Sequence, residues 1–376
     1  MDINQTLNQL ELSGNFRRIP KESAATVVDL SSNDYLGLAE RIDLREEFYS
    51  QHSPASMPMS ASASRLLGGR QREFDAFEHT LAGAYRRPAL LFNSGYHANV
   101  GLIQALADSH TLIVADRLVH ASIIDGIRLS GASFERFRHN DYTHLERILD
   151  KKAADYANIL IIAESVYSMD GDRADIGRLI AAKKRSGDKA MLYIDEAHAV
   201  GVLGPAGLGL VAASDRPDDV DIVVGTMGKA LASVGAYAIM TERMRDFMVN
   251  KARSLIFSTA LPPLNIAWSD FIFRQMLGMD SERQRLARLS ESLADALGNQ
   301  YASHIQPLIV GDPHKAVAMS QQLLKLGYKV LPIRTPTVPP GTERLRFSLS
   351  SAISSQAIDA LAEAIAEVSN SMTAGL

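Results

Sequence analysis

The chain of 376 residues contains no cysteine. This absence excludes disulfide bonds, thiolate nucleophiles and metal sites built on cysteine ligands. The sequence also lacks any run of about 18 consecutive apolar residues, so it predicts no membrane-spanning helix and no membrane partner. Its first residues lack the basic and apolar segments of a secretory signal peptide. We therefore expect a protein of the reducing cytoplasm.

An excess of charge of one sign is missing as well. The 39 Lys and Arg residues nearly balance the 43 Asp and Glu residues, which leaves a net charge of −4. This balance argues against a nucleic acid partner, because a polyanion is bound by a strongly basic surface. Hydrophobic residues make up 46% of the chain and charged residues 22%, which is typical of a globular protein with a large core.

A phosphate-binding loop is the third absence. Residues 195–198 read Asp-Glu-Ala-His, which is also the name of a box in ATP-driven helicases. That class requires a loop of the form G-x-x-x-x-G-K-[ST]. The one Gly-Lys pair is Gly228-Lys229, where Ala230 replaces Ser or Thr and Val223 replaces the first Gly. The helicase interpretation therefore fails, and a nucleotide-driven or non-catalytic protein remains only as a distant alternative.

Short apolar runs alternate with helical patterns through the middle of the chain. Strands are predicted at 89–92, 112–115, 159–163, 191–194 and 222–224, and helices at 95–107, 120–129 and 175–186. This alternation favours a mostly parallel sheet covered by helices on both faces. The Ser-, Ala- and Met-rich stretch 53–64 predicts a loop.

The two ends of the chain read differently from the middle. After a helix and a short strand at 27–30 near the N-terminus, the C-terminal third predicts a smaller α+β domain. Its expected elements are one long helix at 264–297, strands at 305–310 and 345–349, and helices at 313–326 and 355–369. We expect an N-terminal segment at 1–45, a large domain at 46–265 and a small domain at 266–376.

Polar residues stand at the carboxyl ends of the predicted strands, where sheets of this class bind ligands. Asp195 ends one strand, and Lys229 follows the next strand along the chain. An acid and a lysine at neighbouring strand ends can hold the two reactive poles of pyridoxal phosphate. The lysine forms a Schiff base, and the acid pairs with the pyridinium nitrogen.

Six motifs occur in an order that covers nearly the whole chain. They are 31–38 (SSNDYLGL), 93–99 (NSGYHAN), 115–122 (ADRLVHAS), 164–172 (ESVYSMDGD), 195–198 (DEAH) and 226–229 (TMGK). Together they resemble the α-oxoamine synthases, which are pyridoxal-phosphate enzymes of the aspartate-aminotransferase fold. The resemblance implies an α/β architecture with a mostly parallel central sheet between helices, and a smaller α+β C-terminal domain.

The resemblance also implies how the cofactor, pyridoxal 5'-phosphate, is bound. Lys229 would carry it, Asp195 would face its ring nitrogen, and both would act in catalysis. His120 would stack on its ring, meet the substrate and serve in proton transfer, while His198 would hydrogen-bond the 3-hydroxyl group. The remaining cofactor-binding residues would hold its phosphate or phenolic oxygen: Ser94, Gly95, Tyr96, Ser168 and Thr226. The first three open a helix, where free backbone N–H groups favour a phosphate.

A second subunit is implied by the segment FSTALPP at 257–263. In the family this segment reaches the phosphate bound by the neighbouring subunit. Ser258 and Thr259 are therefore expected to bind cofactor across an interface, in a homodimer whose sites lie between its subunits. No metal site is expected.

Substrate-binding residues come from both ends of the chain. Arg346 would bind the carboxylate of an amino acid through its two-donor guanidinium. Asn33 would lie near the reacting amine, and Thr337 together with Arg17, or else Arg18, would meet the acyl chain.

The segments 305–312 and 333–342 resemble the branch of the family that joins L-alanine to a pimeloyl thioester, carried by CoA or acyl carrier protein, in biotin biosynthesis. Sister branches that use glycine or serine with another acyl-CoA remain the alternative. The sequence departs from the family at 57–64, where Ser and Ala replace most of the usual glycines.

Overall fold

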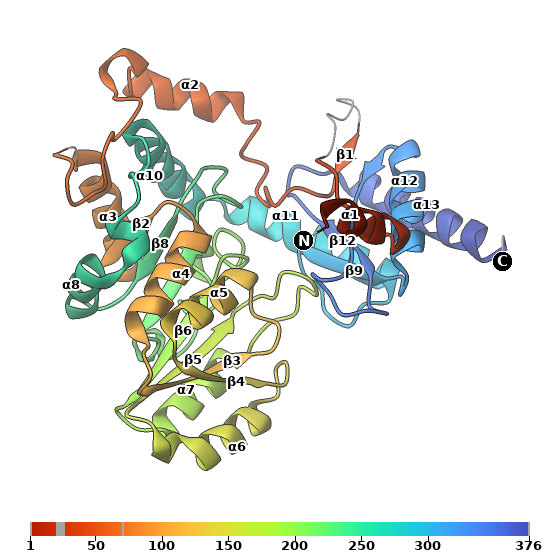
Figure 1. Cartoon of the computed structure of the whole chain (residues 1–376). Helices are drawn as coiled ribbons and strands as arrows, with labels where there is room; N and C mark the ends of the chain where they lie inside the picture. The colour runs from red at the N-terminus through yellow and green to blue at the C-terminus, as the bar shows by residue number, and fades with distance from the viewer. Residues whose placement is uncertain (1, 20–26, 70, 375–376) are drawn as a thin grey trace. The chain divides into compact units, whose positions relative to one another are not determined.

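The computed structural model describes residues 2–19, 27–69 and 71–374, which form two compact units (Figure 1). The larger unit comprises Gly37–Tyr167 and Arg173–Arg283. The smaller unit comprises Met1–Leu36, Ser168–Asp172 and Gln284–Leu376. The domain limits expected from the sequence stay a prediction, because a compact unit need not coincide with a segment that folds alone.

A seven-stranded sheet forms the centre of the larger unit (Figure 1). Its order is β2 (Ala89–Phe92), β8 (Ala236–Ile239), β7 (Ile222–Thr226), β6 (Ala190–Asp195), β5 (Asn158–Glu164), β3 (Thr111–Asp116) and β4 (Ser133–Phe137). Only β8 runs antiparallel to its neighbours. The mostly parallel sheet predicted from the sequence is therefore confirmed. The sequence did not reveal β4, because this edge strand carries charged and exposed residues.

Nine α-helices belong to the described part of the larger unit. They are α2 (Ile42–Gln51), α3 (Arg72–Tyr85), α4 (Gly95–Leu106), α5 (Ala121–Ser130), α6 (Tyr142–Lys152), α7 (Ile176–Arg185), α8 (Glu242–Lys251), α9 (Arg253–Ile256) and α10 (Pro263–Leu277). The stretch 53–64 holds one short 3-10 helix at Pro54–Ser56 and is otherwise turns and loop, as predicted.

The prediction of one helix over 264–297 is wrong. The structure has two helices there, α10 and α11 (Asp280–Leu297). Gly278 ends α10, and Asp280 begins the next helix, where its carboxylate pairs with Arg283 at 2.6 Å. Glycine is a poor helix former and is common just beyond a helix end, and an acid is favourable in a first turn. The apolar periodicity continued through this break and concealed it.

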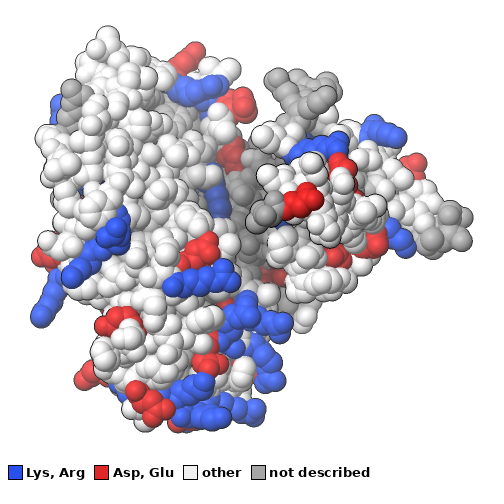
Figure 2. All heavy atoms as spheres, viewed as in Figure 1, with Lys and Arg blue, Asp and Glu red and all other residues white. Residues whose placement is uncertain are grey.

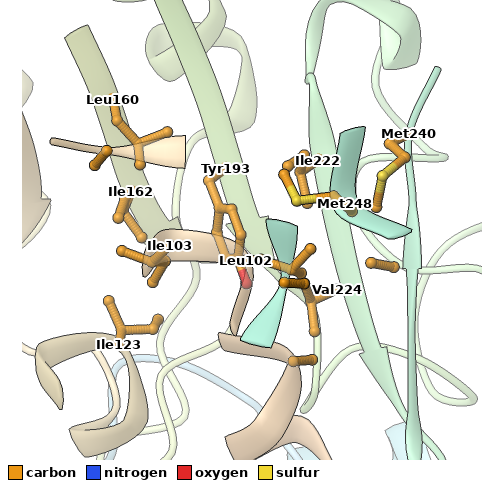
Figure 3. Close-up of a cluster of buried hydrophobic side chains, with 14 of the residues drawn as sticks. Leu102, Ile103, Ile123, Leu160, Ile162, Tyr193, Ile222, Val224, Met240 and Met248 are labelled. Carbon is orange, nitrogen blue, oxygen red and sulfur yellow. The ribbon is translucent and has the colours of Figure 1, made fainter. Parts of the chain in front are cut away.

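The core between the sheet and helices α4, α5 and α8 determines which way the strand ends face. Buried residues from these elements pack together in Figure 3, including Leu102, Ile103, Ile123, Leu160, Ile162, Tyr193, Ile222, Val224 and Met248. Side chains alternate along a strand, so residues two positions apart face the same side. Each polar residue at a strand end lies two positions after a core residue: Glu164 after Ile162, Asp195 after Tyr193, and Thr226 after Val224. All three polar residues therefore face the side covered by α4 and α5.

The smaller unit contains an antiparallel sheet of β11 (Leu331–Ile333), β12 (Arg344–Ser348) and β9 (Ile305–Ile309), in that order. A parallel pair joins β1 (Val28–Asp29) to β10 (Tyr328–Lys329). Helices α1 (Ile3–Leu12), α12 (Pro313–Lys325) and α13 (Ser355–Ala374) complete the unit, together with most of α11. The strands and helices expected for an α+β arrangement are present. No helix in the described ranges is long and apolar enough to cross a membrane.

Charges of both signs are interspersed over the face of the molecule drawn in Figure 2. Ion pairs join α6 to α7: Glu146 lies 3.6 Å from Arg178, and Asp150 lies 2.7 Å from Arg185. These side chains are largely exposed, so each pair contributes only about 0–1 kcal/mol. These pairs therefore contribute little to the free energy of unfolding.

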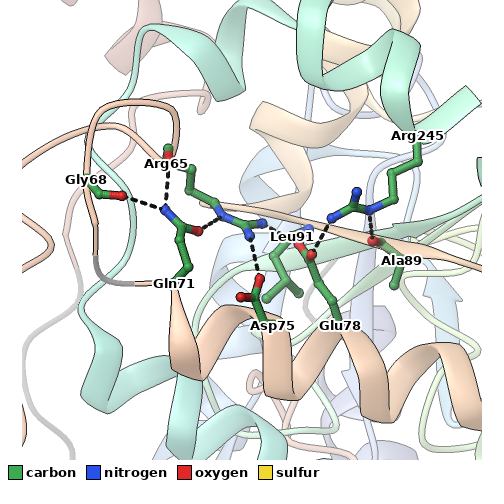
Figure 4. Close-up of polar contacts among 8 residues, drawn as sticks. All are labelled: Arg65, Gly68, Gln71, Asp75, Glu78, Ala89, Leu91 and Arg245. Carbon is green, nitrogen blue, oxygen red and sulfur yellow. Dashed lines mark hydrogen bonds and ion pairs between the residues drawn. The ribbon is translucent and has the colours of Figure 1, made fainter.

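A buried ion-pair network fixes α3 against the edge of the sheet (Figure 4). The carboxylate of Glu78 pairs with Arg65 on one oxygen and with Arg245, at 2.8 Å, on the other. The backbone N–H of Leu91 in β2 donates to the same carboxylate at 3.0 Å. One buried acid thus connects α3, α8, β2 and the loop that precedes α3.

We predict that Glu78→Gln lowers the free energy of unfolding by about 3–5 kcal/mol, because two arginines lose the charge that compensates them in a buried setting. Chemical denaturation followed by circular dichroism measures the loss. Asp75→Asn is the matched control, since Asp75 lies on the same helix, 3.9 Å from Arg65, with a side chain that is 68% exposed. Its expected loss is below about 1 kcal/mol. Equal losses in the two variants would show that burial of Glu78 is not the cause.

Candidate active site

Three polar residues end three neighbouring parallel strands of the larger unit. Glu164 is the last residue of β5, Asp195 of β6 and Thr226 of β7. In the register of the sheet, Glu164 lies opposite Asp195. Both acids are buried, with exposed fractions of 3% and 5%. The carboxyl edge of the sheet, where ligands bind in this class of fold, therefore carries two acids and a hydroxyl on one face.

Donors on two sides fix the orientation of the Asp195 carboxylate. The side-chain amide of Asn99, on α4, donates to Oδ2 at 2.8 Å. The backbone N–H of Ala197 donates to Oδ1 at 2.8 Å. Each carboxylate oxygen is thus oriented by its own donor, so the acid is held in place by the fold.

Lys229 and His198 are neighbours, although 30 residues separate them in the chain. The half-buried Lys229 follows β7 after a turn, and its Nζ lies 2.7 Å from Nε2 of the buried His198. At this distance one nitrogen donates a proton and the other accepts it. The two side chains are therefore hydrogen-bonded to each other, which fixes the direction of the Lys229 amine.

His120 stands at the N-terminus of α5 and is attached to the strand ends by its backbone. Its N–H donates to the carboxyl group of Glu164. The side chain is exposed, and its Nδ1 lies 2.8 Å from the hydroxyl of Ser122. Partial desolvation of the ring lowers the pKa of His120. The positive charge of Lys229 lowers it further, while the negative charges of Asp195 and Asp125 oppose the shift.

Two buried acids side by side cannot both ionise without a large cost. Burial raises the pKa of Glu164 well above its ordinary value, and the neighbouring charge of Asp195 raises it further. Glu164 in its neutral form avoids the repulsion with Asp195. Within the described ranges, no group of three or more His, Asp and Glu side chains is arranged to hold a metal ion.

The first turn of α4 lies beside the end of β7. Ser94 caps the helix by accepting the backbone N–H of His97 at 3.2 Å. A Cβ added at Gly95 would lie 4.0 Å from the hydroxyl oxygen of Thr226. The hydroxyl of Tyr96 donates to Asp125 at 2.6 Å, which directs its side chain to α5. Ser94, Gly95 and Thr226 are thus brought together, beside first-turn N–H groups that have no partner inside the helix. Ser168 belongs to the smaller unit. The roles expected for these residues stay predictions.

The segment at 258–260 lies against the loop that leads into α4. The side-chain amide of Asn93 donates to the carbonyl of Thr259 at 2.6 Å, and the N–H of Ala260 donates to the carbonyl of Ala63 at 3.0 Å. Ser258 is half-buried, and Thr259 is exposed. The role expected for these two residues, binding the phosphate of a second subunit, stays a prediction.

Three residues expected from separate motifs meet in the smaller unit. Arg346, in the central strand β12, donates from Nη1 to Oδ1 of Asn33 at 3.1 Å. Its Nε donates to the carbonyl of Ser168 at 2.5 Å. Arg346 is also buried, with an exposed fraction of 5%. The guanidinium is therefore held in one orientation and does not behave as a mobile surface arginine.

Arg17 and Thr337 also meet in the smaller unit, although they are 320 positions apart in the chain. Nη2 of Arg17 donates to the hydroxyl of Thr337 at 2.9 Å. Arg18 instead pairs with Glu11 at 3.3 Å. Of the two arginines considered for the acyl chain, Arg17 is thus the one that shares its location with Thr337.

Sequence reasoning assigned no role to four residues that organise the strand ends: Glu164, Asn99, Ser122 and Tyr193. The first three fall inside recognised motifs, and Glu164 was expected at a strand end. Two spacings could have pointed to Asn99 and Tyr193. Asn99 lies one helical turn after Gly95, and Tyr193 lies two residues before Asp195 on the same face of a strand.

The amino-acid sequence matches the family model of aminotransferase class I and II over residues 25–365. It is 45% identical over 371 residues to the 8-amino-7-oxononanoate synthase of Haemophilus ducreyi, with 96% of this chain and 95% of that protein aligned.

Two solved structures share the whole architecture. A serine palmitoyltransferase with bound PLP superposes with a TM-score of 0.88 at 27% identity, covering 98% of this chain and 97% of that one. The 8-amino-7-oxononanoate synthase of Francisella tularensis superposes with a TM-score of 0.77 at 27% identity, covering 92% of this chain and 99% of that one. The fold expected from the sequence is confirmed.

Glu196, which follows Asp195, is a fully buried acid whose ionisation opposes folding. Its Oε1 accepts from the N–H groups of Leu210 at 2.7 Å and Val211 at 3.1 Å, whereas no hydrogen bond reaches Oε2 from the described residues. Burial raises the pKa of Glu196 to about 7 from an ordinary value of 4.5, against the effect of these donors.

A raised pKa means that the folded state binds the proton more tightly than the unfolded state. The stability that depends on this proton is present at low pH and is lost as pH rises from about 4.5 through about 7. We predict that Glu196→Gln removes most of this decline, which is on the order of 3 kcal/mol. Thermal unfolding between pH 5 and pH 8 measures it, and the exposed Glu40→Gln is the control. An unchanged pH slope in Glu196→Gln would contradict the assignment.

Proposed function

The chain belongs to the aminotransferase class I and II family, and on this premise we propose that it condenses L-alanine with a pimeloyl thioester. The products are 8-amino-7-oxononanoate, CO2 and the free carrier, CoA or acyl carrier protein, and the pathway served is biotin biosynthesis. The similarity to a curated 8-amino-7-oxononanoate synthase over 96% of the chain supports this reaction. The expectation of an enzyme that uses pyridoxal phosphate agrees with the family and with the structural relatives.

The residues at the carboxyl edge of the larger unit fit pyridoxal phosphate. The observation that carries the assignment is the buried carboxylate of Asp195, fixed by two donors, at the strand end next to the one that leads to Lys229. Asp195 suits the pyridinium nitrogen, and Lys229 suits the aldehyde carbon. The first turn of α4 and the Thr226 hydroxyl suit the phosphate.

When bound, the cofactor supplies an electron sink for the carbanion formed at Cα of the amino acid. The side chains of the protein then hold and move protons. We propose that Lys229, hydrogen-bonded to His198, takes a proton from Cα and returns one. In the same proposal, His120 gives a proton to the oxygen of the thioester carbonyl, which becomes negative during attack.

The reaction balances without an oxidant or a reductant. A carbon–carbon bond forms between Cα of alanine and the thioester carbonyl carbon, and the carbon–sulfur bond breaks to release the carrier as a thiol. The carboxylate of alanine leaves as CO2, and a proton takes its place on Cα. No nucleotide is consumed.

Substrate binding is assigned to the residues that meet in the smaller unit. We propose that Arg346, oriented by Asn33 and the Ser168 carbonyl, binds the alanine carboxylate with its guanidinium. Arg17 and Thr337 contact the acyl chain. A homodimer in which Ser258 and Thr259 reach the partner's cofactor phosphate, and a cytoplasmic location, also stay proposals.

A sister reaction with serine is the second candidate, favoured by the TM-score of 0.88 to a serine palmitoyltransferase. Identity to that protein is only 27%, against 45% to a synthase that forms 8-amino-7-oxononanoate. We predict that mass spectrometry detects 8-amino-7-oxononanoate with alanine and pimeloyl-CoA. Parallel assays replace alanine by glycine or serine, and pimeloyl-CoA by palmitoyl-CoA. A dominant product from serine or glycine would replace alanine in the proposal.

Replacement of Lys229 tests the cofactor assignment directly. We predict that Lys229→Ala removes the visible absorbance of the lysine-linked cofactor and lowers turnover at least about a thousandfold, because the amine that binds the aldehyde and moves the proton is gone. Lys251→Ala, at an exposed position at the end of α8, serves as the control and should behave as wild type. A Lys229→Ala enzyme that kept both properties would exclude this lysine.

A further inference from the structure

A continuous chain of hydrogen bonds joins the Asp195 carboxylate to the ring of His120. The amide nitrogen of Asn99 donates to Asp195 at 2.8 Å and to the hydroxyl of Ser122 at 2.9 Å. The Ser122 hydroxyl in turn lies 2.8 Å from Nδ1 of His120. Asn99 and Ser122 are both buried, with exposed fractions of 2% and 0%. The chain therefore passes through the interior, between α4 and the start of α5.

The direction of each hydrogen bond in this chain is determined by its neighbours. A carboxylate can only accept, so the NH2 group of Asn99 must face Asp195. Its carbonyl oxygen then faces Tyr193, whose hydroxyl donates to it at 2.6 Å. Since both amide protons of Asn99 are used on Asp195 and Ser122, its donors and its acceptor are all occupied. The amide has one orientation that satisfies every contact.

The last link determines which nitrogen of His120 carries the proton. The backbone N–H of Ser122 points at Nδ1 of His120, at a distance of 3.2 Å. A backbone N–H can only donate, so Nδ1 presents its lone pair. The Ser122 hydroxyl accepts a hydrogen bond from Asn99 and can therefore direct its own proton to the same lone pair. The neutral ring therefore carries its proton on Nε2.

We propose that Asn99 is a positioning residue that holds His120 in the Nε2–H form and connects that form to the Asp195 carboxylate. In this form His120 offers a proton from Nε2 and cannot accept one there. His120 is thereby committed to donate in the acyl transfer. This last consequence rests on the proposed function, whereas the ring state itself depends only on the protein.

The main chain supports the same arrangement from the other side. The His120 N–H donates to Glu164, whose partner in the sheet register is Asp195. Both the backbone and the ring of His120 are thus attached to neighbouring strand ends. The charged groups that face the ring are Asp195, Asp125 and Lys229, with Glu164 at its backbone. Any change in the titration of His120 must be interpreted against these four groups.

The test uses the full-length chain labelled with nitrogen-15 in its histidine rings, with and without pyridoxal phosphate. A spectrum of His120→Gln identifies the His120 signals among those of the 10 histidines. We predict that wild-type His120 shows the Nε2–H form alone at neutral pH. A signal averaged between the two forms, or the Nδ1–H form, would overturn the proposal whatever substrate the enzyme uses.

Asn99→Ala should shift the His120 signals toward the average and raise its pKa by about half a unit to one unit. The Ser122 hydroxyl becomes able to accept from Nδ1–H, and the Asp195 charge is less shielded, so the protonated ring is favoured. Tyr193→Phe is the matched control, because it removes a bond to the same amide but leaves both Asn99 donors in place. Equal shifts in the two variants would assign Asn99 a packing role only and overturn the proposal.

The readout is independent of turnover. Absence of product from alanine and a pimeloyl thioester would overturn the proposed function, yet it would leave the ring state of His120 as measured. Conversely, an active enzyme with an averaged His120 signal would retain the function and lose the positioning role of Asn99.

Discussion

The parallel register of β5, β6 and β7 is the constraint on which the candidate active site depends. Apolar residues at alternate positions must face the core, so the residue two positions beyond the last of them faces the same way. This alternation turns Glu164, Asp195 and Thr226 toward the same pair of helices. A slip of one residue in β6 would send Asp195 to the opposite face, away from Asn99. Packing of the core and placement of the reactive groups are therefore one requirement.

Two adjacent acids, Asp195 and Glu196, show how the fold gives neighbouring residues different environments. Donors from Asn99 and Ala197 hold both oxygens of Asp195. Glu196 faces the opposite way, toward a glycine-containing turn, where a Cβ on Gly209 would come within 2.0 Å of Oε2. Burial with few donors favours the neutral form of Glu196. Each acid thus has a different environment despite their adjacency in the chain.

Sequence reasoning reached the residues whose chemistry is unusual and missed those that only orient them. Asp195 and Lys229 were found because an acid and a lysine at strand ends suggest a specific cofactor. Asn99 was not, since one asparagine in a helix has no distinctive pattern until the helix is seen against β6. The meeting of Arg17 with Thr337 depends on long-range folding that periodicity does not encode. The helix break at Gly278 was hidden by apolar spacing that continued across it.

The smaller unit consists of segments that are far apart in the chain, and this determines when it can assemble during synthesis. The unit is built from three separated stretches, of which Met1–Leu36 is made before the larger unit and Gln284–Leu376 after it. Strand β1 pairs with β10 and so must wait for some 300 residues to be made. All of the larger unit is synthesised before that point. Chains released early would retain the large sheet but would leave the N-terminal stretch without its partner, exposed to proteases and to pairing with other chains.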